Sequence, residues 1–165
     1  MTGADPAELA AELLRRARYG RLTVAVAESL TGGQLAAALT SVPGASAVFR
    51  GSVTAYATDL KASILGVDAT LLAEHGAVHP EVARQMAEGV RRLCGADVGL
   101  ATTGVAGPEP QDGQPVGTVY TAVATADGSA AQHWRFTGTR AGIQRDSTAA
   151  ALNLAVDRLE MWTRS

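Results

Sequence analysis

Residues 22–39 have the sequence LTVAVAESLTGGQLAAAL, in which a short apolar run is followed by small polar residues and then by an alanine-rich run. The apolar run Leu22–Ala27 carries valines and has polar flanks, which predicts a buried strand. Ser29 comes directly after it, and two glycines then introduce a predicted helix over Gln34–Leu39. A buried strand, a turn of hydroxyls and glycines, and a helix together indicate the sheet of an α/β protein.

The same signals place the remaining elements. Further helices are expected over Pro6–Tyr19, from Thr58 to about Gly66, over Asp68–His75, from Pro80 to Leu93, and from Ile143 to about Thr163. Further strands are expected over Ala47–Tyr56, Val98–Thr103, Val116–Ala126 and Ala130–Phe136, with Asp127 and Gly128 as the turn between the last two. We therefore expect one α/β domain over residues 1–165, with a mixed sheet between helical layers.

Composition limits the class of protein. The chain has 165 residues, 47% hydrophobic and 18% charged, with a net charge of -2, which is typical of a globular protein rather than one that binds nucleic acid. A single cysteine, Cys94, excludes an internal disulfide and fits a cytoplasmic location. No stretch approaches the roughly 18 apolar residues of a membrane helix. The three histidines lie far apart without nearby carboxylates, so no metal site is expected.

Three loops share one pattern, in which small residues and a hydroxyl follow a predicted strand. They are AESLTGG at 27–33, AYATDLK at 55–61 and TTGVAGP at 102–108. Ligands of α/β sheets bind beyond the carboxyl ends of the strands, so these loops are candidates for one pocket. Each loop taken alone is also compatible with tight packing.

The chemistry of these loops depends on Ser29, Tyr56 and Lys61, which is the only lysine of the chain. A serine hydroxyl becomes a nucleophile when a base takes its proton, and a desolvated lysine can be that base. Backbone N–H groups near Gly32 and Gly33 could stabilise an oxyanion. The alternative is an N-cap serine, a core tyrosine and a solvated lysine, and the lone lysine is equally compatible with an arginine-rich coding bias.

No phosphate-binding loop motif is present. Arg140 and Arg145, which lie before and within the first turn of the last predicted helix, could bind phosphate oxygens through their forked donors. They could equally be surface charges.

Five separated motifs resemble one known family. They are VAVAESLTGG, VPGASAVFRGSVTAYATDLK, HGAVHPEVA, ATTGVAGP and PVGTVY, and they are collinear with the CinA carboxy-terminal domain family over residues 8–160. The resemblance implies a three-layer α/β/α domain with a mixed, mostly parallel sheet. It also implies hydrolysis of nicotinamide mononucleotide to nicotinic acid mononucleotide and ammonia in pyridine nucleotide salvage, without metal or cofactor.

The resemblance also implies roles for individual residues. Ser29 would be the nucleophile, with Tyr56 and Lys61 as its proton-handling partners. The amide and oxyanion region would be shaped by Thr31, Gly32 and Gly33, and the nucleotide would be held by Ser46, Thr103, Gly104, Arg140 and Arg145. The expected partner is a small-molecule nucleotide, with no nucleic acid and no membrane, and the family favours a homo-oligomer, in particular a dimer.

Four positions depart from the family pattern. Leu30 stands where cysteine is common, Thr58 where asparagine is common, Glu109 and Pro110 replace a glycine run, and Thr139 replaces an aspartate before Arg140. The length of the chain fits the stand-alone form, without the large amino-terminal domain of many relatives. Three other functions remain open at this point: a non-catalytic nucleotide-binding or competence-associated module, an amidohydrolase that acts on another small amide, and a purely structural partner protein.

Overall fold

The structure is a computed structural model that describes residues 3–162. Its helices are α1 (Pro6–Tyr19), α2 (Gln34–Thr40), α3 (Thr58–Ser63), α4 (Ala69–His75), α5 (Pro80–Cys94) and α6 (Arg140–Trp162), with one 3-10 turn, η1 (Ala45–Ala47). Its strands are β1 (Val24–Glu28), β2 (Phe49–Thr54), β3 (Val98–Gly104), β4 (Thr118–Thr125) and β5 (Gly128–Arg135). None of the helices in the described part is long and apolar enough to cross a membrane.

The five strands form one mixed sheet in the order β2-β1-β3-β4-β5. β1 pairs with β2 and β3 in parallel, whereas β4 is antiparallel to both β3 and β5. The mixed sheet is as expected, but its pairings divide evenly between parallel and antiparallel, rather than being mostly parallel. The reason is the β4–β5 hairpin, which adds two antiparallel ladders to a three-stranded parallel half.

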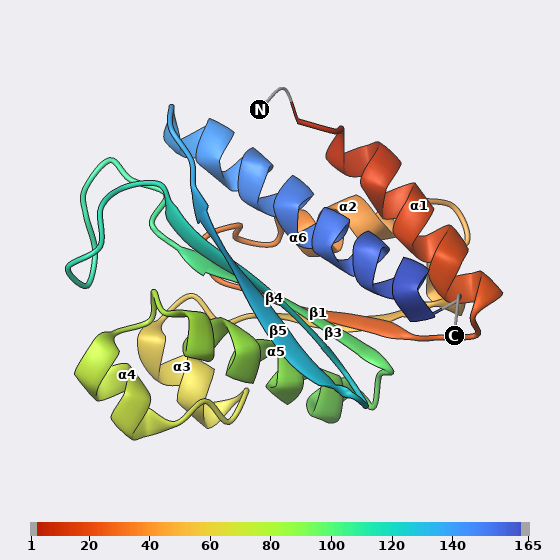
Figure 1. Ribbon diagram of the computed structural model, residues 1–165, viewed down its shortest axis with the longest axis horizontal. Coiled ribbons are helices and arrows are strands. Elements are labelled where there is room, and N and C mark those ends of the chain that lie inside the picture. Colours follow the sequence, from red (N-terminus) through yellow and green to blue (C-terminus); the bar gives the residue numbers. More distant parts are fainter. Residues whose placement is uncertain (1–2, 163–165) are drawn as a thin grey trace.

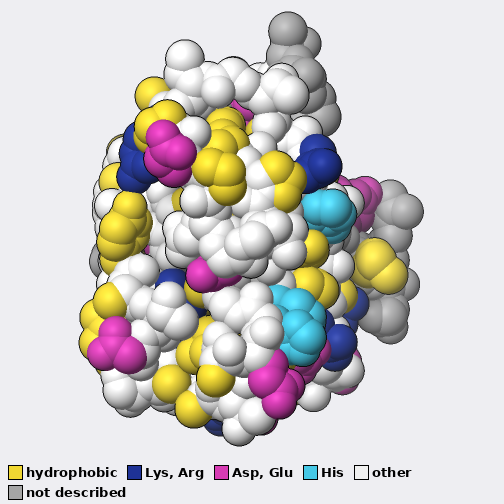
Figure 2. Space-filling model, turned by 90° about the vertical axis from the view of Figure 1, so that its left-hand side faces the viewer, with side chains coloured by type: hydrophobic (Ala, Val, Ile, Leu, Met, Phe, Trp, Pro, Cys, Tyr) yellow, Lys and Arg dark blue, Asp and Glu magenta, His cyan; other side chains and the backbone are white. Residues whose placement is uncertain are grey.

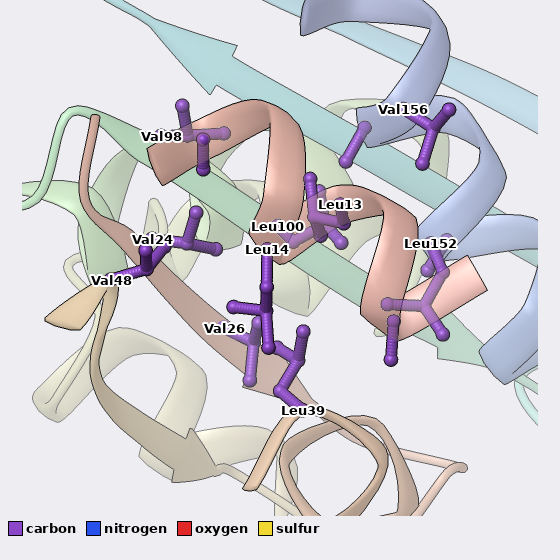
Figure 3. Close-up of a cluster of buried hydrophobic side chains, with 14 of the residues drawn as sticks. Leu13, Leu14, Val24, Val26, Leu39, Val48, Val98, Leu100, Leu152 and Val156 are labelled. Carbon is purple, nitrogen blue, oxygen red and sulfur yellow. The ribbon is translucent and has the colours of Figure 1, made fainter. Parts of the chain in front are cut away.

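Helices cover both faces of this sheet (Figure 1). One layer consists of α1, α2 and α6, and its core includes Leu13, Leu39 and Leu152 packed on Val26 and Leu100 of the sheet (Figure 3). The other layer is built on α5, with α3 and α4 beside it, around a second core that contains Met86 and Leu65. The α/β/α fold that the sequence predicts is thus the observed one.

Local capping explains several element boundaries. Asp5 accepts a hydrogen bond from the N–H of Ala7 and begins α1 at Pro6, as the sequence indicates. His79 begins α5 in the same way, and Gly95 ends it in a left-handed conformation.

Several predicted bounds differ from the structure. β2 is shorter than the strand predicted over 47–56, and α3 ends at Ser63 rather than near Gly66. The hairpin turn and the last helix also differ. The hairpin turn consists of Ala126 and Asp127, because Thr125 pairs with Gly128, which therefore already belongs to β5. The last helix begins at Arg140 rather than at Ile143, so the predicted loop from Gly138 is shorter. The predicted end of that helix at Thr163 lies outside the described residues.

The parallel half of the sheet positions the candidate site. β1, β2 and β3 run in the same direction, so the loops that follow them emerge at one end of the sheet. Figure 1 shows this end on its left, where the 105–117 loop, α3 and α4 also lie. Figure 2 faces this end and shows acidic and basic side chains interspersed over it.

Candidate active site

Ser29 and Lys61 are in direct contact. Ser29 follows β1, and Lys61 lies on α3, which follows β2. The Lys61 Nζ donates to the Ser29 Oγ at 2.9 Å and to the backbone carbonyl of Ala55 at 2.7 Å. Lys61 is only 1% exposed and Ser29 8%, so the amine is almost fully buried and only a small part of the serine is accessible to water. A solvated lysine, the alternative left open by the sequence, is therefore wrong.

The environment of Lys61 changes its protonation. Burial lowers the pKa of Lys61 from 10.5 to about 8, because the ammonium loses its hydration, while the negative charge of Asp112 acts in the opposite direction. The nearest hydrogen-bond partners of the amine are a hydroxyl and a carbonyl, and neither carries a charge. Lowering the pKa to about 8 thus leaves a minor fraction of Lys61 neutral near physiological pH, and this fraction is able to accept a proton.

Tyr56 does not contact this pair through a hydrogen bond among the described residues. Its side chain is 59% exposed, and its hydroxyl accepts a hydrogen bond of 2.9 Å from the Nη2 of Arg140. The Nη1 of Arg140 donates to the carbonyl of Gly107. Tyr56 is therefore not a core residue, and Lys61 contacts Ser29 without it as an intermediary.

Ser29, Tyr56 and Arg140 line the same surface hollow. It is lined by Ser29, Leu30, Tyr56, Gly104, Val105, Ala106, Gly107, Glu109, Gln111 and Arg140. Its lining comes from the ends of β1, β2 and β3, from the loop after β3 and from the start of α6, and its cavity volume is about 140 Å³. Three of the chemical groups singled out from the sequence, those of Ser29, Tyr56 and Arg140, thus open onto one surface, with Lys61 behind Ser29.

A buried carboxylate braces the loop that carries Ser29. Glu28 is fully buried, and its Oε1 accepts from the hydroxyl of Thr31 at 2.6 Å and from the N–H of Leu35 at 2.8 Å. Its Oε2 accepts from the N–H of Ala36 at 3.0 Å. The Thr31 hydroxyl also lies 2.8 Å from that of Thr102 on β3. Thr31 is thus a buried part of the loop scaffold, and α2 takes its N-terminal cap from Glu28.

Glu28→Gln is expected to lower the free energy of unfolding by about 2–3 kcal/mol, because an amide nitrogen would face an N–H or hydroxyl donor where a carboxylate oxygen now accepts. Urea unfolding followed by circular dichroism measures this loss. Glu74→Gln, at an exposed carboxylate on α4, is the matched control and should change stability by less than about 0.5 kcal/mol. Equal stability of the two variants would show that Glu28 does not brace the loop.

The two glycines after Ser29 act through their backbone conformation. Gly32 and Gly33 have φ of 59° and 103°, which residues with a side chain rarely adopt. A Cβ at either position would meet no protein atom within 4 Å, so the backbone conformation, and not crowding by neighbouring residues, is what favours glycine here. The N–H of Gly32 donates to the carbonyl of Ser29 within the turn. The expected oxyanion donor at Gly32 is therefore engaged elsewhere.

Two other N–H groups at the hollow are candidates for that role. Leu30 and Gly107 line the hollow, and their N–H groups donate no hydrogen bond to the part of the chain that the structure describes. Leu30 follows the serine directly, and Gly107 approaches from the loop after β3. They are the candidate oxyanion donors of this geometry.

The structure separates the remaining predicted binding residues. Gly104 lines the hollow, whereas the hydroxyl of Thr103 is buried and donates to the carbonyl of Ala77 at 2.8 Å. Ser46 lies in η1 ahead of β2, whose first residue pairs with the first residue of β1, so it is at the opposite end of the sheet from Ser29. The Nη2 of Arg145 lies 3.7 Å from the Oδ1 of Asp5, and both residues line a different surface hollow. Within one chain, these three side chains do not reach the hollow at Ser29.

Sequence reasoning missed several residues of the site. Glu28 follows a buried strand, and the helix after it has no capping side chain of its own, which is the signal that could have identified it. Asp112 carries the charge that acts on Lys61, and its carboxylate accepts from the N–H of Ala77 at 3.0 Å. Glu109 and Gln111 line the hollow from a loop whose path has no sequence signal.

Comparison with known proteins gives a consistent result. A model of the CinA C-terminal domain family matches residues 6–159. A CinA-like protein of Frankia casuarinae is 54% identical over 80% of this chain and 30% of its own length, and one of Gloeobacter violaceus is 50% identical over 85% and 34%. The chain thus spans about a third of the length of these curated relatives.

Solved structures share the fold over nearly the whole chain. A CinA superfamily protein of Klebsiella pneumoniae has a TM-score of 0.92 and 32% identity, covering 96% of this chain and all of that one. A competence/damage inducible protein of Agrobacterium tumefaciens has a TM-score of 0.90 and 33% identity, covering 97% and 98%.

Proposed function

We propose, since the chain belongs to the CinA C-terminal domain family, that it hydrolyses the carboxamide of nicotinamide mononucleotide to give nicotinic acid mononucleotide and ammonia in NAD salvage. The observation that carries the proposal is the 2.9 Å contact between Lys61 Nζ and Ser29 Oγ beside a hollow that also presents Arg140. A buried amine on a serine hydroxyl suits nucleophilic attack on an acyl carbon. A guanidinium at the rim suits the nucleotide phosphate.

The first half of the reaction forms an acyl-enzyme. Neutral Lys61 accepts the proton of the Ser29 hydroxyl as the Oγ attacks the carboxamide carbon. The N–H groups of Leu30 and Gly107 stabilise the oxyanion of the tetrahedral intermediate. Lys61 then returns its proton to the amide nitrogen, the carbon–nitrogen bond breaks, and ammonia leaves.

The second half uses the same groups. Lys61 takes a proton from a water molecule, which attacks the Ser29 ester, and then protonates the Oγ as the ester bond breaks. The products are nicotinic acid mononucleotide and the original Ser29 hydroxyl. Each turnover thus consumes one water and passes two protons through Lys61, and Tyr56 serves to orient Arg140.

An ammonia assay tests the function directly. Purified protein is incubated with nicotinamide mononucleotide, nicotinamide, asparagine and glutamine, with and without a chelator. We expect ammonia and nicotinic acid mononucleotide in equal amounts from the nucleotide alone, at a rate that the chelator does not change. Binding of the nucleotide without ammonia would indicate a non-catalytic module, and release from another amide would indicate a different amidohydrolase. Loss of activity on chelation would contradict the serine mechanism.

The rate is expected to depend on pH through Lys61. Its base form is required, and burial lowers its pKa to about 8, so kcat/KM should rise about tenfold per unit below pH 8 and become constant above it. The measurement is kcat/KM between pH 6.5 and 9.5 at constant ionic strength. A rate that falls as pH rises through 8 would mean that the ammonium is the active form.

A substitution that removes the negative charge of Asp112 tests the cause of this pH dependence. Asp112 favours the ammonium form of Lys61, so Asp112→Asn should lower the pKa and move the rising limb to lower pH. The asparagine carbonyl can still accept from the N–H of Ala77. Asp59→Asn, at an exposed carboxylate on α3 itself, is the control and should leave the limb in place. A shift toward higher pH in Asp112→Asn would contradict the assignment.

A further inference from the structure

Two opposite charges line the hollow without neutralising each other. Arg140 is held in place by Tyr56 and by the carbonyl of Gly107, neither of which is an anion. Glu109 is exposed on the 105–117 loop. Among the described residues, neither side chain forms an ion pair, and Glu109 makes no hydrogen bond. A ligand in the hollow therefore meets a fixed guanidinium and a free carboxylate.

This arrangement discriminates between classes of ligand. A phosphate alone would be attracted by Arg140 and repelled by Glu109, and a neutral amide would gain nothing from either charge. A ligand with a separated anion and cation can interact favourably with both. Nicotinamide mononucleotide has this charge pattern, because its ribose joins a phosphate to a cationic pyridinium ring that bears the carboxamide.

Resting on the proposed function, we propose that Glu109 is a specificity-determining residue that recognises the positive charge of the pyridinium ring. Arg140 then takes the phosphate end, while Glu109 selects carboxamides on a cationic ring over those on a neutral one. Glu109 is exposed and makes no hydrogen bond to Ser29 among the described residues, so its contribution is to affinity rather than to the chemical step. The preferred substrate class is an N1-ribosylated pyridinium carboxamide.

A pair of ligands isolates this charge. Nicotinamide mononucleotide and its dihydro form share the carboxamide, ribose and phosphate, but only the oxidised ring is cationic. Their dissociation constants are measured by calorimetry in a Ser29→Ala background, where no turnover occurs. Glu109→Gln is introduced into this background, and Glu74→Gln, at an exposed carboxylate on α4, is the control.

We expect Glu109→Gln to weaken binding of the oxidised nucleotide about threefold to fivefold, the size of an exposed charge pair. The dihydro nucleotide, which carries only the phosphate charge, should bind equally well or more tightly. The difference should shrink at high salt, and Glu74→Gln should change neither constant. Equal changes for both nucleotides, or no change for the oxidised one, would overturn the proposal.

The outcomes separate this inference from the proposed function. A protein that releases no ammonia but loses its preference for the oxidised ring in Glu109→Gln would disprove the deamidase and keep Glu109 as a cation-recognising residue. A protein that releases ammonia but whose preference for the oxidised nucleotide is unchanged in Glu109→Gln would support the deamidase function. It would exclude Glu109 as the cation-recognising residue.

Discussion

Turnover of nicotinamide mononucleotide is expected to fall by about 10⁴-fold or more in Ser29→Ala, while the dissociation constant of the nucleotide changes little. Among the described residues, the hydroxyl is the only group of the hollow in hydrogen-bond contact with a buried base, so its removal leaves no route to an acyl-enzyme. Ammonia release and calorimetric binding measure the two effects. The folded state should persist, because alanine removes only one oxygen from an 8% exposed position.

Another serine provides the control for this variant. Ser46 lies at the opposite end of the sheet, so Ser46→Ala should retain both kcat and KM. If Ser29→Ala kept near-normal ammonia release, attack by a serine would be excluded, and water activated by Lys61 would become the mechanism to test.

Replacement of Lys61 by methionine is expected to lower kcat by about 10³-fold or more, because no other base contacts the Ser29 hydroxyl in the described structure. Methionine fits the volume of the buried chain and removes the desolvation of an ammonium. The carbonyl of Ala55 loses its donor, so we expect stability to change by no more than about 2 kcal/mol. Steady-state kinetics and thermal unfolding together measure both effects.

Lys61→Arg distinguishes a role of Lys61 as a base from a role as a fixed positive charge. A guanidinium keeps the positive charge but does not lose its proton near neutral pH, so this variant should be as inactive as Lys61→Met. Substantial activity in Lys61→Arg alone would mean that Lys61 acts as a fixed cation, and the proton transfers assigned to it would be wrong.

The sequence predicts the fold well wherever local signals are strong. Asp5 and Pro6 define the start of α1, and Gly95 defines the end of α5, because caps act over a few residues. The turn predicted from the sequence lies one residue further along the chain than the observed turn. An Asp-Gly pair has a strong turn preference, whereas the register of β4 and β5 decides which two residues form the turn.

The site was predictable in part. The common direction of β1, β2 and β3 brings the loops carrying Ser29 and Lys61 together, which strand order allows one to expect. Thr103 and Gly104 are consecutive residues of β3, so they face opposite sides of the sheet, and the sequence does not specify which side meets the pocket. Thr103 is therefore hydrogen-bonded to Ala77, although Gly104 lines the hollow. The roles assigned to these residues stay predictions for the experiments above.

The carbonyl of Ala55 has a consequence for the reaction cycle. A lysine paired with a carboxylate would be locked as a cation, and each removal of its proton would strand an anion in the interior. A peptide dipole tolerates the amine in either form, since it accepts one hydrogen in both. The amine can therefore shuttle between its two states repeatedly while the surrounding atoms stay in place.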